Sequence, residues 1–252
     1  MTMANGFKDY FSGNSNQYKA YRPRYPLELF AYLAELPASC QRAWDCATGT
    51  GQSAVMLAGH FPEVIATDAS ETQIAAAEPC DGVSYRVAVA EESEIADSSI
   101  DLVTVAQALH WFDLERFAQE VKRVLRPGGV LAVWSYGLMV VSDPIDKIIH
   151  HLYHDILGGY WPKERVMVEQ GYKDIRFPFA DVPFPEVAMK ERWNLHQLLG
   201  YLNTWSAVKR YQEKTGNDSL QIVQNDFELA WGNWQGTKEI RWPLVVRVWK
   251  KE

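Results

Sequence analysis

A glycine turn between two acids holds the residues best suited to bind a ligand. The apolar run that ends at Asp45 opens into a turn that contains Gly49 and Gly51. Glycine has no Cβ, so the backbone of such a turn can approach a ligand closely, and the following helix start offers free N–H groups. Asp68 ends a second apolar run, where its carboxylate could accept both hydroxyl groups of a ribose. The pattern predicts an adenosine-type ligand but specifies no reaction.

Strand and helix patterns alternate after this turn. Apolar residues recur at the spacing of one buried helix face, and short apolar runs bounded by turn residues indicate strands. The expected order is a strand that ends at 45, helix 52–61, strand 64–68, helix 70–78, strands 84–89 and 100–106, helix 113–125, and strand 130–134. This alternation predicts an α/β protein with a doubly wound, mostly parallel sheet.

The later half of the chain changes to helices with many aromatic residues. We expect helices at 143–157, 162–170, 194–203, 204–213 and 218–231, and strands near 187–193 and 240–249. There is no repeat and no low-complexity linker, which favours an insertion into the sheet over a tethered second domain. The expected division is an N-terminal arm with a first helix (1–36), a cofactor-binding core (37–135), a mainly helical acceptor-side insertion or lid (136–238), and a closing strand (239–252).

Composition limits the partners and the compartment. The chain of 252 residues has 25 Lys and Arg against 32 Asp and Glu and no dense basic cluster, so a nucleic acid is not expected as its partner. No stretch approaches the roughly eighteen apolar residues of a membrane span. Three unevenly spaced cysteines indicate neither a disulfide framework nor a zinc site. We expect a cytoplasmic protein that acts on a small molecule, whose oligomeric state the sequence leaves open.

Histidines are the side chains with an unperturbed pKa nearest to neutral. His110 lies in the segment after strand 100–106, where it could be a general base or an acceptor contact, although a packed, hydrogen-bonded histidine that shapes the pocket is the more common case. His150 and His154 share a helix face, but a zinc site needs a third ligand, and the apolar stripe of that helix indicates packing. No metal is therefore expected.

Four segments in a fixed order resemble one enzyme family. They are Asp45-x-Ala47-x-Gly49-x-Gly51, the acid at Asp68, the run AQALHWFD at 106–113, and the run LRPGG at 125–129. This combination resembles class I S-adenosylmethionine-dependent methyltransferases, and looks most like the trans-aconitate methyltransferase-like branch of the type 11 methyltransferases. The resemblance implies a Rossmann-like, mostly parallel seven-stranded sheet. It also implies S-adenosylmethionine as cofactor, S-adenosylhomocysteine as product, and a small-molecule acceptor.

The resemblance also implies a set of cofactor-binding residues. Gly49 and Gly51 would pass beneath the methionine portion of the cofactor, and Asp45 would fix the turn and the amino group. The full set is Tyr18, Asp45, Ala47, Gly49, Gly51, Asp68, Ala69, Ala90, Glu91, Gln107 and Ala108. In it, Asp68 would hold the ribose, Ala90 and Glu91 would face the adenine, Gln107 and Ala108 would line the floor, and Tyr18 would form a lid. Ala47 replaces the family's first glycine, so we expect its backbone to avoid glycine-only angles.

Methyl transfer from a sulfonium needs mainly positioning of the acceptor and exclusion of water. A carboxylate acceptor is ionised at neutral pH and needs no base, whereas a phenol or an amine would benefit from one. Arg22 could bind an acidic acceptor or could only pair with nearby acids, and Trp111 and Tyr136 are expected to line the acceptor side.

Two other functions remain open at this point. The pattern Gly49-x-Gly51-x-x-Ala54 also fits a dinucleotide-binding turn, which would suit a nicotinamide-dependent oxidoreductase, although the LRPGG turn and the late closing strand favour the methyltransferase. Ala47 in place of glycine would also permit a cofactor-binding protein without catalysis.

Overall fold

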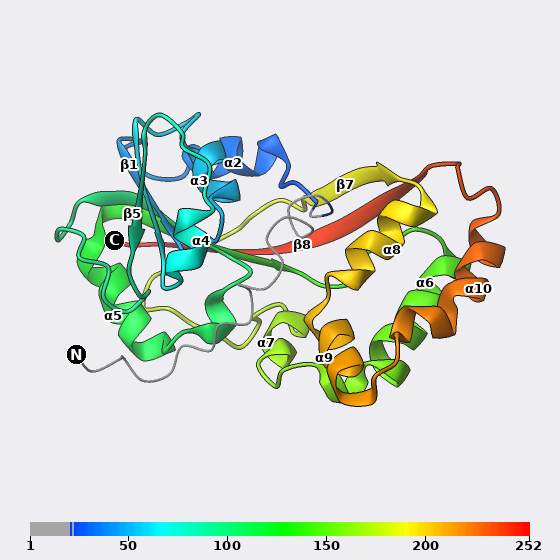
Figure 1. Cartoon of the computed structure of the whole chain (residues 1–252). Coiled ribbons are helices and arrows are strands. Elements are labelled where there is room, and N and C mark those ends of the chain that lie inside the picture. Colours follow the sequence, from blue (N-terminus) through cyan, green and yellow to red (C-terminus); the bar gives the residue numbers. More distant parts are fainter. Residues whose placement is uncertain (1–20, 22) are drawn as a thin grey trace.

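The computed structural model describes residue 21 and residues 23–252, and a twisted sheet crosses the whole molecule (Figure 1). The strands are β1 (Arg42–Cys46), β2 (Glu63–Asp68), β3 (Val83–Val87), β4 (Ile100–Ala106), β5 (Leu125–Tyr136), β6 (Ala180–Val182), β7 (Ala188–Trp193) and β8 (Lys238–Lys250). The α-helices are α2 (Leu27–Ala34), α3 (Gln52–Leu57), α4 (Glu71–Ala75), α5 (Leu114–Val124), α6 (Asp143–His150), α7 (Arg165–Glu169), α8 (Leu195–Asn203), α9 (Ser206–Thr215) and α10 (Ser219–Trp231). Short 3₁₀ helices are η1 (Leu109–Trp111) and η3 (Gly158–Tyr160), and η2 (His151–Ile156) is a π-helix.

The sheet has the doubly wound topology that the sequence predicts. Seven strands follow the order β3-β2-β1-β4-β5-β8-β6, and β7 pairs with β8 beside this path. The first five are parallel, and β8 runs antiparallel to its three neighbours β5, β6 and β7. Strand β6 was not predicted, because it has only three residues and all of them are exposed or half-buried. The strand order reverses between β1 and β4, which is where a ligand binds in such sheets.

Two hydrophobic clusters cover the two faces of the sheet. Successive strand residues point to opposite faces, so Val64 joins the cluster that includes α2 and α3, while Ile65 joins the cluster that includes α5. Because helices cover both faces, the central strands are almost continuously apolar, as β4 is from Ile100 to Val105 apart from two polar residues. The core therefore fixes the carboxyl ends of β1, β2 and β4 relative to one another.

Helix α5 forms as its sequence predicts. The side chain of Asp113 accepts a hydrogen bond from the backbone N–H of Arg116 and so caps the first turn. Phe117, Val121 and Val124 are fully buried on one face of the helix. The helix begins at the carboxyl end of β4 and returns the chain to the opposite edge of the sheet, so its first turn borders the candidate site.

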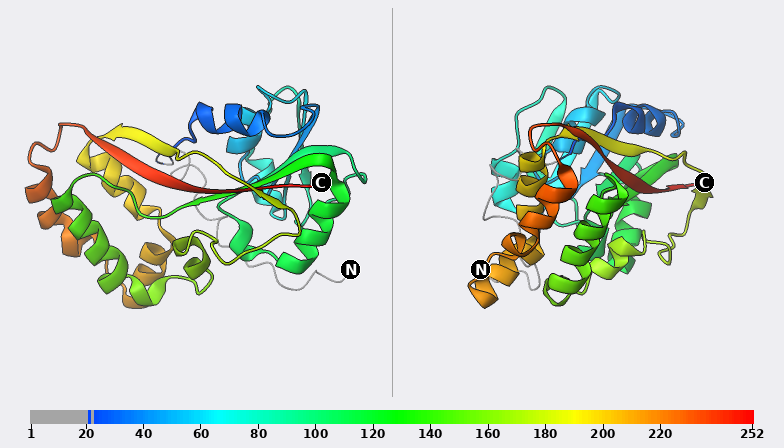
Figure 2. Two further views of the ribbon diagram at one scale, coloured as in Figure 1. Left: turned by 180° about the vertical axis from the view of Figure 1, so that it is seen from behind. Right: turned by 90° about the vertical axis from the view of Figure 1, so that its right-hand side faces the viewer.

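The later helices gather at the end of β8 that lies away from α2 to α5 (Figure 2). Strand β8 spans both regions, because Lys238–Pro243 pairs with β7 and Leu244–Lys250 pairs with β5. The helix expected at 143–157 is divided into α6 and the π-helix η2. None of the helices within residues 23–252 is long and apolar enough to cross a membrane.

Candidate active site

Asp45 stabilises the glycine turn from the end of β1. Its carboxylate is 1% exposed and accepts hydrogen bonds from the hydroxyl groups of Thr48, at 2.5 Å, and of Thr104 on the neighbouring strand β4, at 2.7 Å. Burial raises the pKa of Asp45 to about 6; the two hydroxyl groups lower it in part, and the charge of Asp68 raises it further. The carboxylate is thus a fixed, buried acceptor that joins the turn to β4.

Asp68 stabilises the same turn from the end of β2. One carboxylate oxygen accepts the backbone N–H of Gly49 at 2.8 Å, and the other accepts that of Ser70 at 2.9 Å. A carboxylate can accept up to about four hydrogen bonds, so these contacts are compatible with binding a sugar hydroxyl. The two acids that sequence analysis singled out therefore lie on the two sides of one turn.

The turn itself has the backbone of a ligand cradle. Gly49 has φ 58°, and a Cβ there would meet only Gln73 Oε1 at 3.8 Å, so the space over this residue is open. Gly51 has φ 88°, and its missing side chain makes room for the Tyr85 ring, whose hydroxyl would clash with a Cβ. Gln52 Nε2 donates to the Pro23 carbonyl at 3.2 Å and so ties the segment before α2 to the start of α3. Sequence reasoning missed Tyr85 and Gln52, because neither type is typical of a glycine turn.

Two residues other than glycine have left-handed backbone angles at the carboxyl ends of β1 and β4. Ala47 has φ 55° after β1, and Gln107 has φ 57° after β4. This region favours glycine but is open to other residues, so the angle agrees with the expectation that Ala47 avoids glycine-only angles. The surrounding hydrogen bonds hold this conformation: Thr48 N–H binds the Thr67 carbonyl at 2.9 Å, and Gln107 N–H binds the Trp134 carbonyl at 2.9 Å. Strained residues of this kind are concentrated at functional sites.

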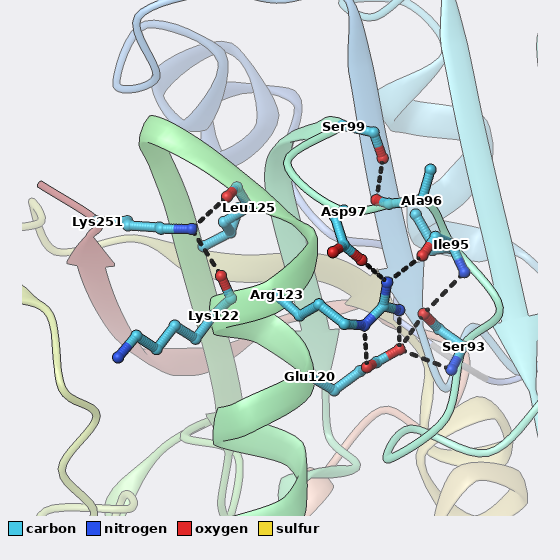
Figure 3. Close-up of polar contacts among 10 residues, drawn as sticks. All are labelled: Ser93, Ile95, Ala96, Asp97, Ser99, Glu120, Lys122, Arg123, Leu125 and Lys251. Atoms are coloured by element: carbon cyan, nitrogen blue, oxygen red, sulfur yellow. Dashed lines mark hydrogen bonds and ion pairs between the residues drawn. The ribbon is translucent and has the colours of Figure 1, made fainter.

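A polar network fixes the loop that carries Ala90 and Glu91. The Glu91 carboxylate accepts the backbone N–H of Asp113 at 2.8 Å, which places this residue at the start of α5. Glu120 binds the Ser93 N–H and hydroxyl, and Arg123 joins Glu120 to the same loop through Asp97 and the Ile95 carbonyl, as Figure 3 shows. Ala90 is 7% exposed. The loop therefore has a defined position beside the ends of β2 and β4.

Gln107 and Ala108 connect the ends of β4 and β5. The Gln107 amide donates to the Tyr136 carbonyl at 2.9 Å, and the next residue, Ala108, is 8% exposed. The Tyr136 ring packs at 6.5 Å from the ring of Tyr25, which follows the N-terminal segment. Tyr136 and Gln107, predicted to serve acceptor and cofactor respectively, are thus in direct contact.

His110 lies in η1 and faces the helical insertion. Its Nδ1 is 2.9 Å from the Tyr172 hydroxyl, and its ring is 4.7 Å from that of Trp111. Burial and the nearby positive charge of Arg165 lower the pKa of His110 to about 4, so the ring is neutral at pH 7. Burial, with a further contribution from Tyr25, raises the pKa of Tyr172, which stays a phenol. Tyr172 was not singled out from the sequence, because it is 62 residues away from His110.

The remaining predicted residues fall into three groups. Ala69, next to Asp68 in the chain, and Trp111, next to His110, are both half-buried. Tyr18 and Arg22 lie outside the residues that the structure describes. His150 and His154 are exposed, with rings stacked 5.6 Å apart, and no group of three or more potential metal ligands occurs within the described part of the chain.

Comparison with known proteins assigns the family. A family model for a methyltransferase domain matches residues 44–133. A protein of Dictyostelium discoideum that is named as a methyltransferase is 33% identical over 253 residues, which cover 98% of this chain and 96% of that protein. The chain belongs to the class I S-adenosylmethionine-dependent methyltransferases. This membership excludes the alternative of a nicotinamide-dependent oxidoreductase, and it makes S-adenosylmethionine the cofactor.

Two further similarities agree with this assignment. A solved structure from Anaeromyxobacter dehalogenans, described as a type II methyltransferase, is 41% identical with a TM-score of 0.87 and covers 91% of this methyltransferase and 98% of that chain. A Saccharomyces cerevisiae protein named as an S-adenosylmethionine-dependent methyltransferase is 32% identical over 131 residues, 48% of this chain and 45% of that protein. The turn with open space over Gly49 and the two acids beside it suit a cofactor with a ribose and an amino group.

Proposed function

We propose that this methyltransferase transfers a methyl group to the carboxylate of a small molecule. The observation that carries the proposal is the setting of His110, the titratable side chain of η1: its Nδ1 is 2.9 Å from the Tyr172 hydroxyl, and its burial lowers its pKa to about 4. A histidine whose conjugate acid has a pKa of about 4 is a weak base, poorly matched to a phenol or an ammonium group. A carboxylate has no proton to lose at neutral pH, so it needs no base. The residues of η1 therefore suit a carboxylate acceptor better than a phenol or an amine.

The cofactor would lie across the switch point between β1 and β4. Bound S-adenosylmethionine supplies an activated methyl group on its sulfonium. Asp45 would hold the turn and attract the amino group, and Asp68 would accept the ribose hydroxyls. The supporting residues would be Ala47, Gly49, Gly51, Ala69, Ala90, Glu91, Gln107 and Ala108, with Tyr18 from the N-terminal segment. Their part is to bind and orient, which is most of what transfer from a sulfonium requires.

The acceptor would lie between the ends of β4 and β5 and the helical insertion. Trp111, Tyr136 and Arg22 would contact it there, and His110, bonded to Tyr172, would shape the pocket as a neutral contact. We propose that 136–238 acts as the acceptor-side lid over the core at 37–135, with 1–36 as the arm and 239–252 as the closing strand. The overall negative charge favours a small molecule over a nucleic acid, and three unpaired cysteines fit the reducing cytoplasm.

A transfer assay tests the acceptor class. The protein is incubated with S-adenosylmethionine that is tritiated on the methyl group and with matched sets of small carboxylic acids, phenols and amines. We expect label in acids only, released as methanol by mild base because the product is an ester. The kcat should be almost constant between pH 7 and 8, above the pKa of Asp45, because no general base titrates there. Base-stable label in phenols or amines would contradict the carboxylate acceptor, and no transfer to any set would favour a non-catalytic binding protein.

A further inference from the structure

Arg165 is a cation of the helical insertion whose charge acts on His110. Helix α7, which it begins, packs against η1, which carries His110. The positive charge of Arg165 lowers the pKa values of both His110 and Tyr172, whose side chains are bonded to each other. A cation contributed by the helical insertion thus faces the end of β4, where the acceptor is proposed to bind.

The guanidinium of Arg165 is held by aromatic side chains. Its Cζ is 4.8 Å from the ring centroid of Trp161 and 5.6 Å from that of Tyr153. These two rings stack on each other at 4.5 Å, and Trp205 packs against both of them. Arginine binds well to aromatic faces, because the guanidinium is planar and weakly hydrated. The arrangement fixes the orientation of the guanidinium without neutralising its charge.

Hydrogen bonding leaves the outer nitrogens of this guanidinium available. Arg165 Nε donates to the Tyr153 hydroxyl at 2.9 Å, and that hydroxyl donates to the Glu169 carboxylate at 2.5 Å. Glu169 is therefore bound through Tyr153 and forms no direct ion pair with Arg165. No ion pair joins Arg165 to any carboxylate among the described residues, and its Nη1 and Nη2 have no hydrogen-bond partner there.

The π-helix η2 contributes to this arrangement. Tyr153 lies within it, is 3% exposed, and points its hydroxyl towards α7. A π-helix adds a residue to a turn and so changes the direction of the side chains that follow, which is why such turns are frequent at functional sites. The residue that orients Arg165 is thus itself on an unusual backbone.

We propose that Arg165 is a specificity-determining residue, whose outer guanidinium nitrogens bind the carboxylate of an acceptor that packs against the surrounding aromatic rings. The inference rests on the proposed carboxylate methylation and adds the residue that recognises the acid. Two parallel N–H donors match the two oxygens of a carboxylate, and the half-buried setting strengthens the contact. An acceptor with two or more acidic groups, or with one acid on an aromatic body, would fit this chemistry.

The test compares acids with their neutral amides. Benzoate, phenylacetate, succinate and fumarate serve as acceptors, and the matching carboxamides serve as competing ligands. We expect the wild-type protein to methylate at least one acid and to bind it at least about tenfold more tightly than its amide. Arg165→Gln should raise the KM for the acid by about tenfold or more, with a smaller change in kcat, and should abolish the preference over the amide. Arg165→Lys should fall in between, because it keeps the charge but loses the paired donors.

Lys163→Gln is the matched control. It removes one positive charge from the exposed segment just before α7, and its KM should stay within about twofold of the wild type. The S-adenosylhomocysteine affinity of every variant should also equal that of the wild type.

An unchanged KM in Arg165→Gln would overturn the inference, as would transfer to none of the four acids by a protein that binds S-adenosylhomocysteine. An equal loss of S-adenosylhomocysteine affinity would show that Arg165 serves the cofactor and would overturn it too. A wild-type protein that failed to bind S-adenosylhomocysteine would contradict the proposed function itself, and the inference with it.

Discussion

At the residue scale, the backbone at the ends of β1 and β4 is strained. Ala47 and Gln107 have φ values of 55° and 57°, in the region where an L-residue costs about 1–2 kcal/mol. Both residues follow directly after strands that pair in the centre of the sheet. A buried acid, Asp45, is also held there at a cost in solvation. Strain and buried charge therefore coincide where the cofactor is proposed to bind. Both lower the free energy of unfolding of the protein.

Replacing Ala47 and Gly49 should have opposite effects on stability. Ala47→Gly relieves the left-handed strain, so the free energy of unfolding should stay constant or rise by up to about 1 kcal/mol. Gly49→Ala introduces the same strain at φ 58° without a steric clash, so it should lower that energy by about 1 kcal/mol. Urea denaturation of both variants measures the difference. A loss of stability in both would contradict the account of Ala47.

The sequence predicts the site residues in part. Asp45, Gly49 and Asp68 could be found because a glycine turn between strand-ending acids is a local pattern. The contact between His110 and Tyr172 and the place of Arg165 depend on the packing of α7 against η1, which no local pattern specifies. The functions of Tyr18 and Arg22 stay predictions.

At the element scale, helix α5 holds the loop that is proposed to contact the adenine. Glu120 is 8% exposed and binds both Ser93 and Arg123 across the gap between helix and loop (Figure 3). Burial would raise the pKa of Glu120, but the hydrogen bonds from Arg123 and Ser93 lower it overall. The ionised carboxylate is therefore the form that stabilises the fold. This contribution is present above the ordinary pKa of a glutamate and is lost as the pH falls through the lowered value.

Glu120→Ala should destabilise the protein and loosen this loop. Removing the carboxylate leaves the Arg123 guanidinium and the Ser93 N–H without their shared acceptor, which should cost about 2 kcal/mol near pH 7. Glu115→Ala removes an exposed acid from the same helix and should change stability by less than about 0.5 kcal/mol. Urea denaturation at pH 7 and at pH 4 measures both. Equal stability of the two variants at pH 7 would contradict the role of Glu120.

Most elements could be predicted from periodicity alone, and the failures have physical causes. The amphipathic stripe and the Asp113 cap locate α5 closely, because both signals lie within the helix itself. The helix expected at 52–61 ends earlier, at Leu57, and continues as a turn. The π-helix η2 has no distinct local pattern, because its apolar residues continue the stripe of α6.

At the scale of the whole molecule, β8 joins the core of the sheet to the helical insertion. Its first half pairs with β7 among the later helices, and its second half pairs with β5 in the core (Figure 1). Trp242 lies in the first half, fully buried between the rings of Trp193 and Tyr201. A continuous strand resists bending, so we expect the insertion and the core to unfold together.

Two tryptophan substitutions test this connection. Trp242→Ala should lower the free energy of unfolding by about 3–5 kcal/mol, because it leaves a cavity beneath β8. Trp234→Ala, at a side chain that is 61% exposed, should change it by less than about 0.5 kcal/mol. In both, circular dichroism and tryptophan fluorescence should report one coincident transition. Two separated transitions would contradict the coupling through β8.

The central claim is that Asp68 holds the cofactor across the switch point of the sheet. Calorimetric titration with S-adenosylhomocysteine, applied to the wild-type protein, to Asp68→Asn and to Asp81→Asn, tests it most directly. Asp81 is an exposed acid and serves as the control. We predict that the wild type and Asp81→Asn bind alike, and that Asp68→Asn binds at least about tenfold more weakly, because an amide accepts fewer hydrogen bonds and carries no charge. Unchanged affinity in Asp68→Asn would contradict the proposed position of the ribose.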